Sequence, residues 1–319
     1  MELFTIENGV LTAYLPAHGP EADPTQITAD DLAIFTDEPV PVAPAQTELV
    51  IPEGVVAIAP DVFAKCRELR AVHLPDSLRY VGERAFFACS GLERVTGGVG
   101  ITHLEEAAFA DCTALTAFDL PQTLLSLDPY ALAGTGLCRV ALPEGLIRLG
   151  RCAFAHCPHL QEVALPHTVE EPEESVFLDC RALRTLRLPE GMTTVPKGLC
   201  ASCTALTEIV LPESVTAIGE RAFSSCAALT SLTLHSHVKR VGNEAFAMCE
   251  GLLSVTLCEG VEMLGDKVFH YCRNLREIAL PASLRALGRF LFMRCPRDLI
   301  IRAPEGSYAA ATVKTMKWI

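Results

Sequence analysis

Cysteine recurs along this chain at a fixed interval of 23 residues. The series is interrupted once, at Thr135, after which a single residue is missing. Its ten members are Cys66, Cys89, Cys112, Cys157, Cys180, Cys203, Cys226, Cys249, Cys272 and Cys295. A constant period of roughly 20–50 residues is typical of one small structural unit stacked on copies of itself. The spacing therefore predicts a solenoid.

Other positions keep the same period, and the unit reads C-x-x-L-x-x-I-x-L-P-x-x-V-x-x-I-G-x-x-A-F-x-x. Its I-x-L step has a period of two, which predicts a short strand with both apolar residues on one face. Proline after the strand has no N–H to donate, so it ends the ladder. The A-F-x-x-C-x-x-L stretch has spacings of three and four, which predicts a short helix or 3₁₀ turn.

Eleven units run from the one that carries Cys66 to the one that carries Cys295. One unit cannot bury its apolar face alone, so stacking must supply the partner. We expect one long parallel sheet, with the helical turns on the opposite face. Its 12 strands are centred on Leu49, Val72, Val95, Phe118, Val140, Val163, Leu186, Ile209, Leu232, Val255, Ile278 and Ile301. The unit is irregular at Pro172 and at Val195-Pro196, which predicts a local change in the stack.

The motif L-x-x-I-x-L-P…I-G-x-x-A-F-x-x-C at 23 residues resembles the BspA-like class of bacterial leucine-rich repeats. The resemblance covers residues 47–304, although the asparagine ladder of the commoner leucine-rich pattern is missing. It implies an α/β fold: a right-handed leucine-rich-repeat solenoid with its parallel sheet on the concave face and short helices or 3₁₀ turns on the convex face. It also implies binding of other macromolecules and no catalytic residues.

The two ends break the period. Residues 1–15 are expected to form a capping β-hairpin, because Asn8-Gly9 favours a type I′ turn between two apolar segments. Residues 16–46 are rich in proline and acidic residues and are expected to be a loop or arm, with one short helix from Thr28 to Phe35. The solenoid of about 11 repeats follows at 47–304. Residues 305–319 are expected to form a helical C-terminal cap that Trp318 seals.

Composition narrows the class of protein. Hydrophobic residues make up 50% of the chain, yet no apolar run approaches the ~20 residues of a spanning helix. The net charge is −13, and an acidic chain without a basic cluster argues against nucleic acid or membrane partners. No secretory signal is recognisable at the start, which predicts a cytoplasmic location. The alternative is the cell surface, if the full-length gene carries a leader.

The ten periodic cysteines are expected to be reduced packing residues, since a buried free cysteine behaves as a small hydrophobe. Cys138 and Cys152 fall at positions expected to face solvent, and Cys258 replaces the strand-end proline. Whether these three thiols are redox-active stays open. Cys200 occupies a phenylalanine position and makes a C-x-x-C pair with Cys203, which is interpreted as a core substitution.

Candidate metal ligands are sparse. Cys152, His156, Cys157 and His159 lie close in sequence, but their side chains are expected to diverge. His235 and His237 alternate as surface residues do. No nucleophile elbow, phosphate loop or H-E-x-x-H motif is present. The sequence therefore predicts no enzyme, no cofactor and no metal site.

A binding surface is expected on the outward residues of the strands. Its charged members, the candidate contact residues, are Arg94, Arg139, Glu162, Arg187, Glu208 and Glu277. The surface has mixed charge and no aromatic residue. We therefore expect a non-enzymatic protein-interaction scaffold that is a monomer or weak homodimer. The alternative is a surface or secreted adhesin that binds host or matrix proteins.

Overall fold

The computed structural model describes residues 3–15 and 47–315. The predicted arm, the helix beginning at Thr28 and the sealing role of Trp318 lie outside these residues. The chain divides into two compact units, Met1–Leu137 and Cys138–Ile319. Each unit is a parallel β-solenoid with very little helix, and the two together hold about 11 turns.

Unit 1 begins with a hairpin of β1 (Leu3–Glu7) and β2 (Val10–Leu15), which pair antiparallel. Asn8 and Gly9 both have positive φ, at 51° and 78°, as a type I′ turn requires. β2 then pairs in parallel with β4 (Ala57–Ile58). The ring of Tyr14 lies 5.1 Å from that of Phe63, so the hairpin contacts the first coil through its side chains as well.

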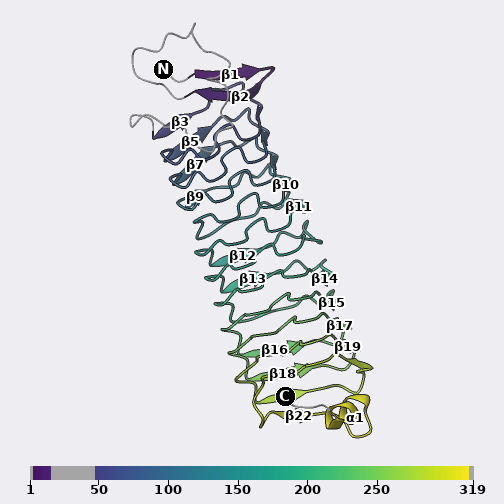
Figure 1. Cartoon of the computed structure of the whole chain (residues 1–319). Coiled ribbons are helices and arrows are strands. Elements are labelled where there is room, and N and C mark those ends of the chain that lie inside the picture. Colours follow the sequence, from purple (N-terminus) through teal and green to yellow (C-terminus); the bar gives the residue numbers. More distant parts are fainter. Residues whose placement is uncertain (1–2, 16–46, 316–319) are drawn as a thin grey trace. The chain divides into compact units, whose positions relative to one another are not determined.

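The coils of unit 1 carry two rows of parallel strands where the sequence predicted one (Figure 1). Row 1 contains β3 (Glu48–Val50), β5 (Ala71–Leu74), β7 (Arg94–Gly97) and β9 (Ala117–Phe118). Row 2 contains β4, β6 (Tyr80–Val81), β8 (His103–Leu104) and β10 (Ser126–Leu127). Row 2 comes from the V-x-x-I-G step. Its strands have two residues each, too short to leave a period-two signal.

Unit 2 has the same two rows. Row 1 contains β12 (Glu162–Ala164), β13 (Thr185–Arg187), β16 (Ser231–Leu234), β18 (Ser254–Leu257), β20 (Glu277–Ala279) and β22 (Ile300–Arg302). Row 2 contains β11 (Arg148–Leu149), β14 (Thr194–Val195), β15 (Ala217–Ile218), β17 (Arg240–Val241), β19 (Met263–Leu264) and β21 (Ala286–Leu287).

Both rows of unit 2 are interrupted. The predicted strand at Val140 is reduced to a single bridge between Arg139 and Glu162. The predicted strand at Ile209 is absent, and residues 207–211 make no backbone–backbone hydrogen bond with any described residue. Row 2 has no strand at Pro172, a residue without an N–H to donate. The irregularity predicted at Pro172 is therefore present.

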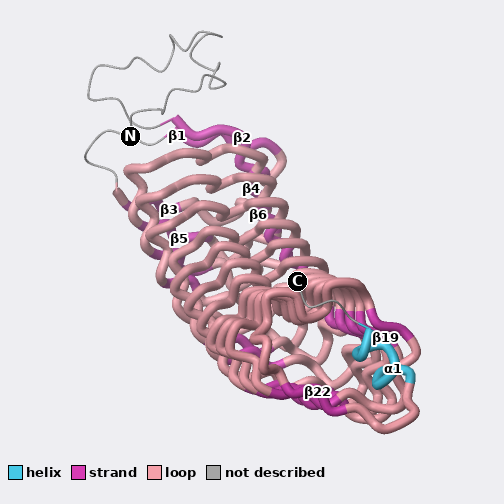
Figure 2. Tube along the Cα trace, turned by 60° about the horizontal axis from the view of Figure 1, so that its bottom comes forward, coloured by secondary structure: helices cyan, strands magenta, loops and turns pink. Residues whose placement is uncertain are grey.

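The A-F-x-x-C segment is not helical, contrary to the prediction (Figure 2). Its amides alternate between two partners. Phe86 N donates to Ala108 O of the next coil at 2.8 Å, whereas Cys89 N donates to Phe86 O within its own coil at 3.3 Å. This alternation requires positive φ, as at Ala88 with 56°. Apolar residues spaced three and four apart are compatible with these consecutive turns as well as with a helix. The spacing therefore could not distinguish the two structures.

The residue that precedes each periodic cysteine, or Thr135, has positive φ in every coil, and we name these residues the corner row. Its members are Lys65, Ala88, Asp111, Gly134, His156, Asp179, Ser202, Ser225, Met248, Tyr271 and Arg294. None is buried. The corner row therefore presents one side chain per coil towards solvent.

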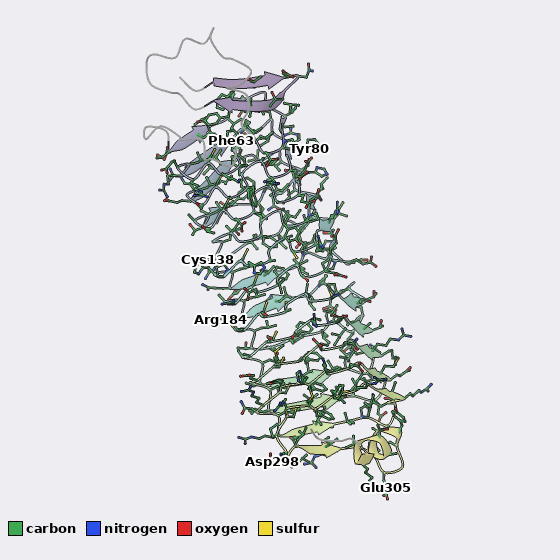
Figure 3. The ribbon with its side chains drawn as sticks, in the orientation of Figure 1. Phe63, Tyr80, Cys138, Arg184, Asp298 and Glu305 are labelled. Atoms are coloured by element: carbon green, nitrogen blue, oxygen red, sulfur yellow. The ribbon has the colours of Figure 1, made fainter. Side chains whose placement is uncertain are left out.

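The interior of each unit is a column of phenylalanines. In unit 1, Phe86 stacks on Phe63 and on Phe109, with ring centroids 4.9 Å apart in both pairs. All three are fully buried, and Figure 3 places Phe63 among the coils. In unit 2, Phe246 stacks between Phe223 and Phe269 in the same way.

One α-helix is present in the described chain, α1 (Tyr308–Thr315). Ser307 precedes it, and the Ala310 amide donates to Ser307 Oγ at 3.1 Å, the contact that an N-cap makes. α1 has eight residues, so no described helix has the length and apolar character to cross a membrane.

Candidate functional site

The periodic thiols lie in the interior, directly beside the phenylalanine column. Most of them also donate a hydrogen bond to the backbone of the preceding coil. Cys112 Sγ donates to Phe86 O at 3.1 Å, and Cys272 Sγ donates to Phe246 O at 3.3 Å. At the interruption, Thr135 Oγ1 donates to Leu132 O at 3.0 Å instead. The periodic position therefore supplies a donor as well as packing, a role that its apolar character in the sequence did not reveal.

Burial makes several of these thiols poor nucleophiles. It raises the pKa of the Cys249 thiol from 9.0 to about 12 and that of Cys295 to about 11. It also raises the pKa of Cys200, which sits fully buried in the phenylalanine position beside Cys203. The thiolate is the reactive form of cysteine. The C-x-x-C pair accordingly has the environment of a core substitution.

Of the three thiols outside the periodic series that were expected to be exposed, Cys152 needs correction. Cys152 is buried, with 7% of its surface exposed. Its amide donates to Glu174 O of the next coil, so this residue lies against the neighbouring coil, where a small side chain is covered. Cys138 and Cys258 are partly exposed.

The four sequence-adjacent ligand candidates do not converge. His156 Nδ1 lies 3.3 Å from Asp179 Oδ2 of the next coil, on the corner row, whereas Cys157 is in the interior. His235 and His237, in contrast, lie together, with ring centroids 5.8 Å apart. Glu213 of the preceding coil completes a group of three whose ligand atoms lie within 4.8 Å of one another. Among the described residues this is the one such group.

The six contact residues expected on the strand face are divided between the two units. Arg94 lies in unit 1 and pairs with Glu48 at 2.6 Å. The other five lie on row 1 of unit 2, where Glu277 pairs with Arg302 at 3.5 Å. Arg139 and Glu162 form the parallel bridge already described. Arg187 ends β13, and Glu208 lies in the interruption of row 1 beside Val210, which is 65% exposed.

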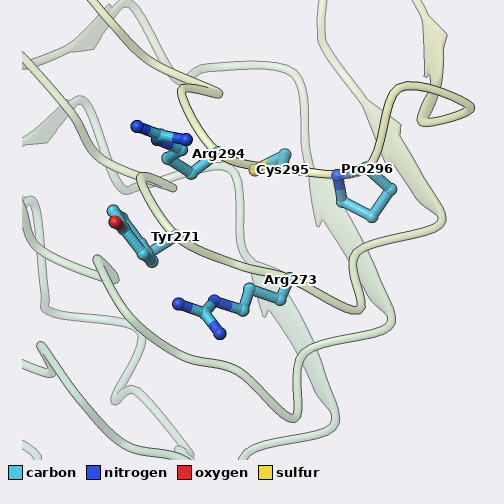
Figure 4. Close-up of a pocket in the computed structure, with 5 residues that line it drawn as sticks. All are labelled: Tyr271, Arg273, Arg294, Cys295 and Pro296. Atoms are coloured by element: carbon cyan, nitrogen blue, oxygen red, sulfur yellow. The ribbon is translucent and has the colours of Figure 1, made fainter.

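A pocket of about 340 Å³ near the end of unit 2 escaped the sequence analysis. Tyr271, Arg273, Arg294, Cys295 and Pro296 line it. Figure 4 shows the ring of Tyr271 between the two guanidinium groups. The guanidinium carbon of Arg273 lies 5.0 Å from the ring centroid, a cation–π contact. Tyr271 and Arg294 are consecutive members of the corner row, so the backbone of the turn positions both.

The pocket lies in the most basic part of an acidic chain. Residues 267–302 contain eight lysines and arginines but only two acidic residues. Arg273 has an ion pair with Glu250 at 3.6 Å, whereas Arg294 has none with a described residue. The prediction that the chain lacks a basic cluster is therefore wrong for this stretch. A local count of charges, in place of the net charge, would have found it.

Comparison with known proteins agrees with this architecture. The profile of the BspA-type leucine-rich repeat region matches in six copies, over residues 44–157, 127–252 and 200–299. No curated protein matches the chain. Several solved structures share the fold.

A leucine-rich repeat protein from Bacteroides ovatus has 22% identity and a TM-score of 0.50, over 85% of this chain and 92% of that one. A leucine-rich cell surface protein from Faecalibacterium prausnitzii has 24% identity and a TM-score of 0.53, over 84% and 90%. The pneumococcal vaccine antigen PcpA has 19% identity and a TM-score of 0.54, over 81% and 79%. With the repeat profile matched over most of its length, the chain belongs to the BspA-type leucine-rich repeat family.

Proposed function

We propose that this protein is a non-enzymatic protein-interaction scaffold and that the Tyr271 pocket binds an acidic segment of its partner. The observation that carries the proposal is the placement of Tyr271 between two exposed arginines on neighbouring coils. Tyrosine and arginine are the residue types enriched at binding hot spots. A guanidinium group can also hold a carboxylate through two parallel hydrogen bonds.

Charge supports an acidic partner. The eight basic residues of 267–302 give this end of unit 2 a positive field within a chain of net charge −13. Such a field attracts an acidic segment and speeds its association at low salt. Arg294 has no ion pair with a described residue, so it can engage a carboxylate without losing an existing contact.

Repeat architecture supports a scaffold rather than an enzyme. Each coil contacts mainly its neighbours, which yields an extended surface that suits the binding of macromolecules. Burial raises the pKa of several interior thiols, among them Cys226, Cys249 and Cys272, which lowers their reactivity.

The row 1 face of unit 2 is a second contact surface for the same partner. Arg139 and Arg187 are exposed there without an ion pair to any described residue, and Glu162 and Glu208 lie on the same face. Val210 adds exposed apolar area at the interruption. Arg94 and Glu277 already have ion pairs and are expected to contribute less.

Two double variants separate these surfaces. After the partner is identified by affinity capture, its affinity is measured by surface plasmon resonance against the pocket variant Arg273→Ala/Arg294→Ala and against the row 1 variant Arg139→Ala/Arg187→Ala, which tests the second surface. Loss of two hot-spot residues costs about 2 kcal/mol or more, so the pocket variant should bind at least about thirtyfold more weakly. Added salt should weaken binding to the wild type. A pocket variant that binds as the wild type does would rule out this site, and preferential binding of nucleic acid would rule out the protein partner.

A second candidate is a surface adhesin. The fold is shared with a leucine-rich cell surface protein and with a vaccine antigen, which favours display outside the cell. Protease treatment of intact producing cells should then degrade the protein while a cytoplasmic marker survives. Full protection until lysis would place the scaffold in the cytoplasm.

A further inference from the structure

Three side chains of unit 2 converge where row 1 ends after β16. His237 Nδ1 lies 3.0 Å from Glu213 Oε2, and His235 Nδ1 lies 3.7 Å from the same oxygen. A zinc ion held by nitrogen and oxygen at about 2.0–2.1 Å in tetrahedral geometry has ligand atoms about 3.4 Å apart. The apo geometry is therefore close to that of a coordination sphere.

The 23-residue register explains why the three residues meet. Adding one period to Glu213 reaches Ser236, which lies between the two histidines. Glu213 therefore points from its own coil at the gap between two side chains of the next coil. His235 and His237 flank Ser236 in the turn that follows β16, and this turn places their ring centroids 5.8 Å apart.

Glutamate at this position has a structural role elsewhere in the repeat. In two other coils it accepts hydrogen bonds from backbone amides of the next coil. Glu53 Oε1 accepts from Asp76 N at 3.1 Å, and Glu259 accepts from Ala282 N at 2.8 Å and from Ser283 N at 3.0 Å. The carboxylate of Glu213 faces the imidazoles instead. The carboxylate of Glu213 is therefore placed where it can coordinate a cation together with the two imidazoles.

His235 has the orientation of a metal ligand. Its Nε2 lies 3.0 Å from Pro212 O, and because a carbonyl oxygen can only accept, Nε2 carries the proton. The lone pair is therefore on Nδ1, which lies 3.7 Å from Glu213 Oε2 and accepts a hydrogen bond from the His237 amide at 3.3 Å, a contact that a bound metal would replace. Metal-bound histidines almost always donate their other N–H in this way, to a carboxylate or a backbone carbonyl. The side chain is only 17% exposed, so the ring is held in place.

We propose that Glu213, His235 and His237 form a binding site for a divalent transition-metal ion, with Zn²⁺ as the expected occupant. Two imidazoles and one carboxylate suit zinc, and three protein ligands leave a fourth position for water or for a donor from another molecule. His237 Nδ1 now donates to Glu213 O at 2.9 Å. When the metal binds there, the neutral ring carries its single proton on Nε2.

Isothermal titration of the full chain with ZnCl₂, in a non-chelating reductant, tests the site. We expect one equivalent to bind. His237→Gln and Glu213→Gln should each weaken binding by more than about tenfold, the lower bound for loss of even a supporting partner of a metal ligand. Both side chains are well exposed, at 58% and 73%, so these variants should fold. Circular dichroism without metal checks that they do.

Matched controls come from the same repeat. His167 Nδ1 lies 2.8 Å from Glu144 Oε2, at the equivalent position, but no second histidine is there, so His167→Gln should leave the affinity unchanged. Cys258 follows His235 by one period, and Cys258→Ser should also retain binding. Unchanged affinity in both His237→Gln and Glu213→Gln overturns the proposal. So does loss of binding in Cys258→Ser alone, which would assign the metal to a thiol.

Discussion

Two adjacent positions of the coil behave in opposite ways: the periodic cysteine and the corner-row residue before it. The cysteine position is interior and holds the same residue in ten coils of 11, with Thr135 in the other. The corner row has an equally constant backbone, with positive φ throughout, yet its side chains range from Gly134 to Arg294. Backbone geometry alone therefore does not restrict the residue type. Contact with the packed interior restricts the residue type at the cysteine position. The corner-row side chains face outward, so their residue type can differ from coil to coil.

The largest expected difference between the two regions comes from the phenylalanine column. Phe86→Ala removes a fully buried ring that stacks on two others, so it should lower the free energy of unfolding by about 3–5 kcal/mol. Met248→Ala, on the corner row and 43% exposed, should change it by no more than about 0.5 kcal/mol. Urea unfolding followed by circular dichroism measures both. Equal losses would remove the distinction between interior and corner.

The thiol hydrogen bond is expected to have the next largest effect. Cys112→Ala removes one of the two hydrogen bonds that Phe86 O accepts, the other coming from Cys89 N, which should cost about 0.5–1.5 kcal/mol. Cys258→Ala, where the thiol is partly exposed, is the control and should cost less than about 0.5 kcal/mol. The same unfolding assay applies. If the two alanine variants lose equal stability, the periodic cysteine acts through volume alone.

Alkaline pH should weaken the interior selectively. The pKa of Cys249 is about 12 in the folded chain, against 9.0 for a free thiol. The unfolded chain therefore ionises first, and the stability that this thiol contributes is complete below pH 9 and lost as pH rises towards 12. The loss is at most about 1.4 kcal/mol per pH unit for each such thiol. Denaturant unfolding at pH 8, 9 and 10 in reductant should show a decline that Cys249→Ala makes shallower, and an unchanged slope would contradict this account.

The smallest effect, and the only stabilising one, is expected on the corner row. Ala88 has a φ of 56°, which glycine adopts without strain. Ala88→Gly should therefore raise the free energy of unfolding by about 0.4–1 kcal/mol. Ala85→Gly in the same turn, where φ is not positive and the side chain is buried, should lower it. Thermal unfolding of the pair measures the opposite signs, and a shift in the same direction for both would show that the corner carries no strain.

The stacking of coils could be predicted from the sequence. Each interior residue packs against the equivalent residue of the next coil, so the same residue type recurs at a constant interval. Row 2 and the turns could not. A two-residue strand at Tyr80 and Val81 leaves no periodicity, and the turn around Phe86 has the residue spacing of a helix. Local spacing reports which residues share a face but not the sign of φ.

The candidate sites were missed for a different reason. Glu213 is distant from His235 in sequence, and only the addition of one period places it between the histidines. Tyr271 and Arg294 are likewise separated by one period. Motif searches along the chain do not test residues across the stack. Aligning the 23-residue repeats with one another, and then searching for residues at matching positions of adjacent repeats, would have found both groups.

The interruption of row 1 at residues 207–211 has a mechanical consequence. Because each coil is held mainly by its neighbours, a pulling force passes through every junction between coils in turn. The junction with the fewest contacts is expected to separate at the lowest force. At this junction the row 2 strands β15 and β17 are still joined by backbone hydrogen bonds. The corresponding row 1 hydrogen bonds are missing at residues 207–211. Tension along the stack of unit 2 should therefore open this junction more readily than those where both rows bond. Glu213 and His235 belong to the coils on the two sides of this junction. A metal ion coordinated by both would therefore link the two coils and raise the force needed to separate them.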